Sequence, residues 1–171
     1  MKITTAVHTL ILLALLSLLQ GCGFHLRGTG ATDANLPADI SPLYIQGLDR
    51  GDFLKLELEN LFVNLDIQVS DNVAEAASIL RISDRKSDRR VQTVNSDGKV
   101  AEYQLRESLR FELADRGGDV RVPEQLIELF QIYTNQQDQV LGSLQEESNL
   151  REDMWRRMSD QMIRRLSVQL R

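Results

Sequence analysis

The feature that most restricts the fold is an alternation of apolar and polar residues along residues 103–113. One side of this stretch carries Tyr103, Leu105, Leu109, Phe111 and Leu113, and polar residues stand between them. A period of two is typical of a β-strand with one face on a core and the other in water. Glu107 alone breaks the apolar side. The pattern therefore predicts a sheet with one covered face and one polar face.

A second strand precedes the alternating one. It opens at residues 80–82, and its later part at residues 91–94 resumes after the very polar segment 83–90. Asp97 and Gly98 then form a dipeptide that favours a tight hairpin turn. We expect the two strands to pair in an antiparallel arrangement.

A third strand is expected after the next chain reversal. The reversal is marked by residues 116–119, which include two consecutive glycines, and the strand runs from about residue 120 to residue 134. Pro123 lies within it, which implies an edge position or a bulge because proline donates no backbone hydrogen bond. The three strands are predicted to form an antiparallel meander.

Two amphipathic helices complete the pattern. The first is expected to start at Asp52 as N-cap, and the second at a Ser-x-x-Glu capping box, residues 143–146. Apolar residues recur at helical spacing in each, as Leu54, Leu58, Leu61, Phe62 and Leu65 in the first and as Leu150, Met154, Met158, Met162, Leu166 and Leu170 in the second. Each stripe is the kind of face that packs on a sheet.

Shorter segments fill the rest of the chain. Residues 43–45 predict a short strand, residues 66–70 can return as another, and residues 71–77 as a turn or short helical piece. This order predicts an α+β two-layer sandwich, in which two helices pack on one face of a mainly antiparallel sheet of four to five strands. We assign residues 42–171 to this single globular domain.

The N-terminal segment is expected to leave the protein. Lys2, the apolar residues 10–19 and a small residue before Cys22 have the layout of a signal peptide, residues 1–21. Residues 19–22 match a bacterial lipobox, so we expect cleavage before Cys22, a diacylglyceryl group on its thiol and an acyl chain on the new amino group. Three chains would anchor the protein stably in a membrane. Residues 22–41 would then be a lipidated tether.

Composition removes several classes of function. Cys22 is the sole cysteine, His8 lies in the signal peptide and His25 lies beside the lipid site, so histidine-based triads and His/Cys metal sites are nearly excluded. Without residues 1–21 the chain has 19 basic and 25 acidic side chains, a net charge of −6. This balance gives no general attraction to nucleic acid. We expect no enzyme activity, no metal and no cofactor apart from the covalent lipid.

The best candidate binding site is a basic hairpin. Arg85, Lys86, Arg89 and Arg90 lie close together in the chain, and Lys99 follows the opposing turn. Guanidinium groups bind phosphate with two hydrogen bonds, which suits an anionic glycolipid headgroup. Asp84 and Asp88 partly neutralise the cluster, so a solvated hairpin that protects a sheet edge is the alternative.

Four segments together resemble one known family, the lipopolysaccharide-assembly lipoproteins (LptE, or rare lipoprotein B). They are residues 21–27 at the lipid site, residues 97–104 at the hairpin, residues 130–135 and residues 158–166. The Ala-Glu-Tyr-Gln stretch within residues 97–104 and the Gln-Met-Ile-Arg-Arg-Leu stretch within residues 158–166 are the most diagnostic. The resemblance spans nearly the whole mature chain.

The resemblance implies a non-enzymatic lipoprotein of the outer membrane. Such a protein plugs the lumen of a large β-barrel partner, LptD, from the periplasmic side, and the pair places lipopolysaccharide in the outer leaflet. Gly23, in place of an Asp, is consistent with sorting to the outer membrane. Lipopolysaccharide would be bound through Arg85, Lys86, Arg89, Arg90 and Lys99, because Ser96 stands where some members have a basic residue. The alternative function is an outer-membrane carrier that holds acyl chains in an apolar cavity.

Overall fold

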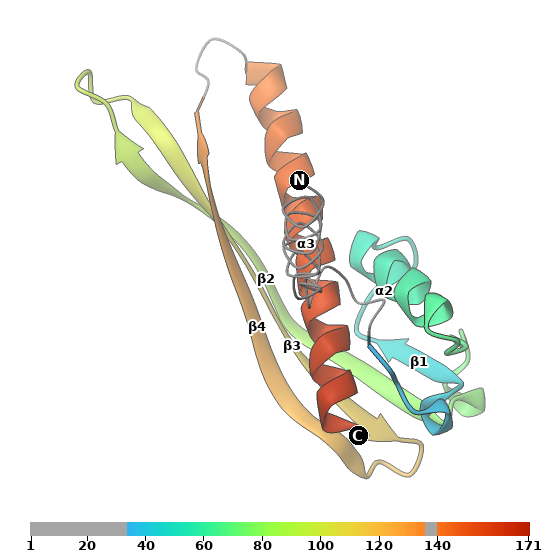
Figure 1. Cartoon of the computed structure of the whole chain (residues 1–171). Coiled ribbons are helices and arrows are strands. Elements are labelled where there is room, and N and C mark those ends of the chain that lie inside the picture. Colours follow the sequence, from blue (N-terminus) through green and yellow to red (C-terminus); the bar gives the residue numbers. More distant parts are fainter. Residues whose placement is uncertain (1–33, 136–139) are drawn as a thin grey trace, which may run out of the picture.

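The computed structural model describes residues 34–135 and 140–171, in which a mixed sheet carries both helices on one face (Figure 1). The sheet has the strand order β1-β2-β3-β4 over this part of the chain. Its strands are β1 (Leu43–Gln46), β2 (Ser78–Val94), β3 (Val100–Asp115) and β4 (Val120–Thr134). The helices are α2 (Phe53–Asn64) and α3 (Val140–Gln169). The predicted α+β two-layer architecture is confirmed.

The meander of β2, β3 and β4 forms the long axis of the molecule. Both connections are antiparallel, and the alternating residues of β3 are paired along nearly their whole length. The register shifts between Phe111 and Leu113, opposite the stretch of β4 that contains Pro123. β4 is also an edge strand, so the proline lies at an edge and beside an irregularity, as expected.

The polar segment 83–90 does not interrupt β2, in contrast to the prediction. β2 runs without a break from Ser78 to Val94, with an irregularity between Ser83 and Lys86 where Asp84 has a φ of 51°. Backbone hydrogen bonds to β3 form whatever the side chains are, and side chains here can remain exposed on either face. The absence of apolar residues therefore reflects exposure and not the loss of the strand.

The core lies between the sheet and the two helices. Asp52 caps α2 by accepting a 2.9 Å hydrogen bond from the backbone nitrogen of Leu54, as predicted. Fully buried side chains that fill this space include Leu54, Leu58, Phe62, Leu80, Leu109, Phe111, Met158 and Met162. The apolar stripes found in the sequence therefore face the core.

β1 adds a parallel strand at the lower end of β2. It pairs with residues 78–81 only, which leaves the upper edge of β2 without a neighbouring strand in the described chain. Gly47 follows β1 with a φ of 94°, and a Cβ atom there would lie 2.0 Å from the carbonyl oxygen of Ile82. A glycine at this position lets the two strands approach each other.

Three boundaries differ from the predictions. α3 already begins at Val140, so Ser143 is inside the helix and the predicted capping box is wrong. A spacing of three residues between Ser and Glu does not define a helix start, because it also occurs between neighbours on one face of a continuing helix. Residues 66–70 contribute only an isolated bridge between Leu43 and Val69. Leu36 and Ile40 are buried in the core, so the packed domain extends before residue 42. Residues 1–33, with Cys22, lie outside the described chain.

Candidate functional site: a charged hairpin and an open sheet face

The structure divides the predicted basic cluster between the two faces of the sheet. Arg89 pairs with Leu105 in the β2–β3 register, and Leu105 is on the core face. Lys86 pairs with Ser108 and Arg90 with Gln104, both at the polar positions of β3. Residues that pair directly across antiparallel strands share a face. The four cations therefore do not form one patch.

Arg85 and Arg89 are turned toward the helices and are engaged there. Arg85 lies 4.2 Å from the centre of the Trp155 ring in α3 and forms an ion pair with Asp52. Arg89 lies 4.6 Å from the centre of the Tyr103 ring and 2.8 Å from a carboxylate oxygen of Glu147. Both guanidinium groups join the hairpin to the helices.

The remaining predicted cations are more available to a ligand. Lys86 pairs with Asp84 at 3.3 Å and is largely exposed. Arg90 is exposed and, among the described residues, has no carboxylate within ion-pair distance. Lys99 closes the turn, where its backbone nitrogen donates to the Asn95 side chain at 2.9 Å. Arg90, Lys86 and Lys99 are therefore the predicted site residues that stay accessible.

A partly buried polar cluster links the hairpin to α3. We call it the Glu107 cluster; its members are Ser87, Arg89, Glu107, Tyr133, Glu147 and Arg151. Arg151 bridges Glu107 of β3 and Glu147 of α3, with 2.8 Å to the latter. The side chain of Glu107 is 0 % exposed, and its second carboxylate oxygen has no hydrogen-bond partner in the described structure.

The pKa values of the two carboxyl groups in this cluster, Glu107 and Glu147, are shifted in opposite directions. Burial raises the pKa of Glu107, and hydrogen bonds from Ser87 and Arg151 only partly compensate. Burial would also raise the pKa of Glu147, but hydrogen bonds from Arg151, Tyr133 and Arg89 outweigh it and lower that pKa. Two differences separate the groups: Glu107 is more deeply buried, and it accepts hydrogen bonds on one oxygen, whereas Glu147 accepts them on both.

One residue of the sequence, Glu107, indicates this cluster. Glu107 stands at an apolar position of the alternating strand, and a buried carboxylate requires a cationic partner. Arg151 is four residues after Glu147 on α3, but its distance from Glu107 along the chain hides the contact. The pairing depends on how α3 crosses the sheet, which the local pattern does not define.

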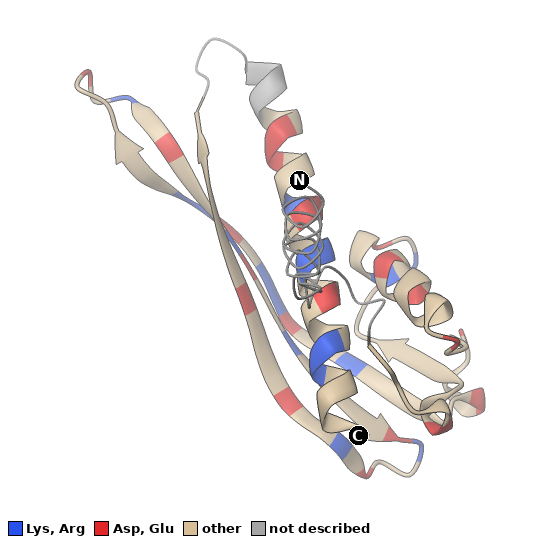
Figure 2. Cartoon of the chain, in the orientation of Figure 1, with Lys and Arg blue, Asp and Glu red and all other residues tan. Residues whose placement is uncertain are grey.

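The face of the sheet that the helices leave open is lined by cross-strand ion pairs. Three arginines take part: Arg81 with Glu112 at 2.6 Å, Arg106 with Glu128 at 2.7 Å, and Arg110 with Glu124 at 3.1 Å. Figure 2 shows acidic and basic residues interspersed along these strands. Such exposed pairs contribute little stability, so they mark a hydrated surface.

An apolar stripe runs beside these ion pairs on the edge strand. Leu126, Phe130 and Ile132 pair with Arg110, Arg106 and Gln104, and so belong to the open face. Their exposed fractions are 45 %, 49 % and 45 %. We call this surface, the ion pairs together with the stripe, the open sheet face. Its mixture of charge and exposed apolar area suits contact with another polar protein surface.

Residues 34–135 and 140–171 contain no group of three His, Cys, Asp or Glu side chains placed to hold a metal ion. Within the same residues no helix combines the length and the apolar character needed to cross a membrane.

Comparison with known proteins identifies one group of relatives. The family model described as LptE, lipopolysaccharide-assembly, matches residues 40–166. A protein from Pectobacterium atrosepticum named LPS-assembly lipoprotein LptE is 26 % identical over 162 residues, which cover 94 % of this chain and 84 % of that protein. A protein of the same name from Photorhabdus laumondii is 30 % identical over 58 % of this chain and 52 % of its own length.

Solved structures agree with this result. The solution structure of lipoprotein B from Nitrosomonas europaea superimposes with a TM-score of 0.66 at 25 % identity, covering 85 % of this chain and 91 % of that one. A minor lipoprotein from Acinetobacter baumannii has a TM-score of 0.62 at 22 % identity, covering 78 % and 93 %. The second similarity concerns the fold alone.

Proposed function

Since the chain belongs to the LptE family of lipopolysaccharide-assembly lipoproteins, we propose that it plugs and supports an LptD-like β-barrel in the outer membrane. The protein would be anchored by lipid on Cys22, with its domain on the periplasmic side within the barrel lumen. It would act without catalysis, as a partner of the barrel and of lipopolysaccharide.

The observation that best supports the plug is the open sheet face. Leu126, Phe130 and Ile132 form an exposed apolar stripe beside cross-strand ion pairs, on the face that the helices do not cover. The lumen of a large outer-membrane barrel is polar and contains water. A polar face interrupted by an apolar stripe can satisfy hydrogen bonds with such a wall and bury some apolar area against it.

The second part of the proposal concerns lipopolysaccharide. Lys86, Arg90 and Lys99 remain accessible on the hairpin, whereas Arg85 and Arg89 are held by Asp52 and Glu147. We therefore assign phosphate contacts to the accessible cations and a structural role to the other two. Replacing Lys86 and Arg90 by Ser should weaken lipopolysaccharide binding and reduce its dependence on salt.

The plug is tested by isolating the lipidated, tagged protein from outer membranes in mild detergent and identifying co-purifying proteins by mass spectrometry. We expect a large β-barrel in equal amount. Phe130→Ser should reduce its recovery, while Leu56→Ser on α2 should not; both residues are 49 % exposed, so the substitutions are matched. Recovery of the protein alone, or equal effects of both variants, would contradict the proposal.

The packing of the described residues does not favour the alternative of an acyl-chain carrier. A carrier needs an apolar cavity between sheet and helices, but buried side chains such as Phe62, Phe111 and Met158 occupy that space. Binding of a fluorescent fatty acid by the purified protein, at a ratio of one to one, would restore this alternative.

A further inference from the structure

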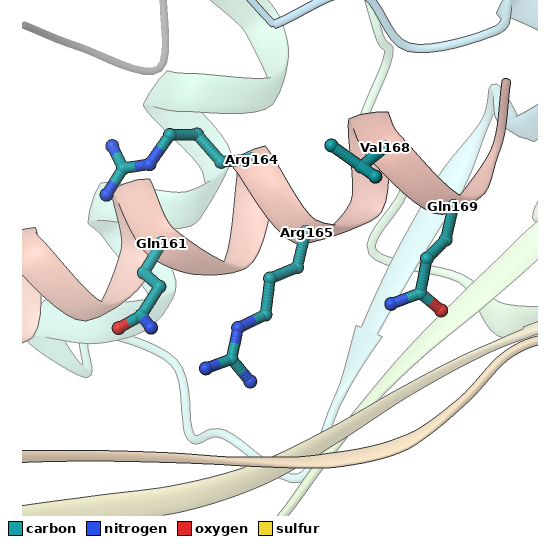
Figure 3. A pocket seen from close by; sticks show the side chains of 5 residues that line it. All are labelled: Gln161, Arg164, Arg165, Val168 and Gln169. Carbon is teal, nitrogen blue, oxygen red and sulfur yellow. The ribbon is translucent and has the colours of Figure 1, made fainter. Parts of the chain in front are cut away.

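The C-terminal end of α3 carries two adjacent arginines, Arg164 and Arg165, and no acidic residue follows them in the sequence. No Asp or Glu occurs between Gln161 and Arg171. Gln161, Arg164, Arg165, Val168 and Gln169 line a shallow hollow of about 290 Å³ on the helix surface (Figure 3). Arg165 extends toward the strands, and Arg164 and Val168 leave the helix further around its axis. Two guanidinium groups therefore flank the hollow.

These two arginines differ from most others in the described chain. Arg156, two turns earlier on α3, forms ion pairs with Glu152 and Asp153. Arg165 instead donates to the backbone carbonyl of Leu126 at 2.8 Å, which fixes it on β4, and no carboxylate of the described residues pairs with it. Arg164 has no ion-pair partner within residues 34–135 and 140–171. Their positive charge is available to an external anion.

An exposed apolar side chain accompanies the charge. Val168 is 66 % exposed, the largest exposed fraction among the exposed large apolar residues of the described chain. It lies one turn after Arg164 and lines the same hollow. Cationic groups next to an exposed apolar residue on a helix are typical of surfaces that meet the interface of a lipid bilayer.

The position of the proposed anchor brings a membrane to this end of the domain. Asn35 and Pro37, near the start of the described chain, line a hollow together with Leu170 and Arg171. Eleven residues lie between Cys22 and Ala34, so the two residues can be at most about 43 Å apart when the chain is fully extended. Lipid on Cys22 would therefore hold the start of the described domain, and the C-terminal end of α3 beside it, within about 43 Å of the bilayer. The hairpin tip lies at the opposite end of the molecule (Figure 1).

We propose that the C-terminal end of α3 is a second membrane contact, in which Arg164 and Arg165 bind the phosphates of anionic phospholipid headgroups and Val168 enters the interface. Guanidinium groups form paired hydrogen bonds with phosphate. Each basic residue near an anionic bilayer strengthens the contact by about five-fold. The inference rests on the lipid anchor of the proposed function, and it does not require the barrel.

The test uses the complete lipidated protein in vesicles. Val168→Cys receives a fluorescent label, which does not react with Cys22 because lipid blocks that thiol, and a nitroxide on lipid headgroups quenches the label. We expect strong quenching in phosphatidylcholine vesicles that contain phosphatidylglycerol, and weak quenching in phosphatidylcholine alone. Arg164→Gln should weaken the contact about five-fold, and high salt should do the same. The Arg164 side chain forms no hydrogen bond or ion pair with the described residues, and its one described hydrogen bond is through its backbone carbonyl, so this variant should fold normally.

Arg157→Gln is the matched control. It removes the same charge from the same helix, at a residue that contacts Gln131 of β4, and it should leave the quenching unchanged. Equal quenching in both vesicle types, or an equal effect of the two variants, would overturn the inference. If the protein is not retained on vesicles at all, the lipid anchor and this inference fail together. Retention without headgroup quenching overturns the membrane contact alone.

Discussion

Glu147→Gln should separate the contribution of charge in the Glu107 cluster from that of packing. The Glu147 carboxylate accepts hydrogen bonds of 2.8 Å from each of Arg89, Arg151 and Tyr133. Its side chain is 15 % exposed, which places it between a surface pair and a fully buried one. A glutamine keeps the shape and one acceptor oxygen but loses the negative charge that attracts both arginines.

The expected loss follows from the degree of burial. Surface ion pairs contribute about 0–1 kcal/mol, and removing one partner of a buried pair costs about 3–5 kcal/mol. For this intermediate site we expect the free energy of unfolding at pH 7 to fall by about 2 kcal/mol. In a domain of this size that corresponds to a decrease in Tm of about 4–8 °C.

The pH dependence gives a sharper test. The pKa of Glu147 is lowered in the folded protein, so its ionised form stabilises the fold above the ordinary value of 4.5, and this contribution is lost as the pH falls through the lowered pKa. Glutamine does not titrate. The difference in unfolding free energy between the two proteins should therefore be greatest near neutral pH and shrink in acid.

Urea unfolding followed by tryptophan fluorescence measures this difference. Trp155 is the sole tryptophan and is 4 % exposed in the core, so its emission reports loss of packing. Glu146→Gln removes the same charge from the neighbouring residue and should change stability by less than about 0.5 kcal/mol. Equal stability of Glu147→Gln and the natural protein at pH 7, or a deficit that persists unchanged at low pH, would refute the reasoning.

Five further substitutions test the fold by urea unfolding. Gly47→Ala should cost more than about 3 kcal/mol because its Cβ would meet the Ile82 carbonyl at 2.0 Å, whereas Gly51→Ala, also at positive φ but in open space, should cost about 1 kcal/mol. Phe62→Ala leaves a cavity at a fully buried site and should cost about 3–5 kcal/mol. Asp52→Ala removes both the α2 cap and the ion pair with Arg85 and should cost about 1–2 kcal/mol, whereas Asp52→Asn should lose less because it keeps a capping acceptor.

The parts of the fold that the sequence predicted are those set by local periodicity. The alternation along β3, the Asp97-Gly98 turn and the Asp52 cap each act within a few residues, and each is present in the structure. The parallel pairing of β1 with β2 was not predicted, because parallel strands meet through a long crossover that leaves no local mark.

The division of the basic cluster depends on one irregularity. Ile82 faces the core, so strict alternation would place Lys86 and Arg90 on the core face and Arg85 and Arg89 on the open one. The register shift between Ser83 and Lys86 reverses this order, and Arg89 consequently pairs with Leu105. A bulge adds one residue to a strand and exchanges its faces beyond that point. Nothing in the composition of residues 83–86 located it in advance.

The Glu107 cluster lies where the apolar packing between the helices and the sheet decreases from one end of the domain to the other. Below it, the large apolar core joins both helices to the sheet, while near it the apolar contacts shrink to a small group, Leu105, Tyr133 and Met154. A buried ion pair adds little net stability, but a buried Glu107 carboxylate without its cationic partner would be strongly destabilising. The contact with Arg151 therefore fixes where α3 crosses β3. The hairpin beyond is held mainly by backbone pairing to β3. Segments with few buried contacts open at low cost in free energy. The exposed end of the hairpin can therefore adapt to a partner while the core below it stays folded.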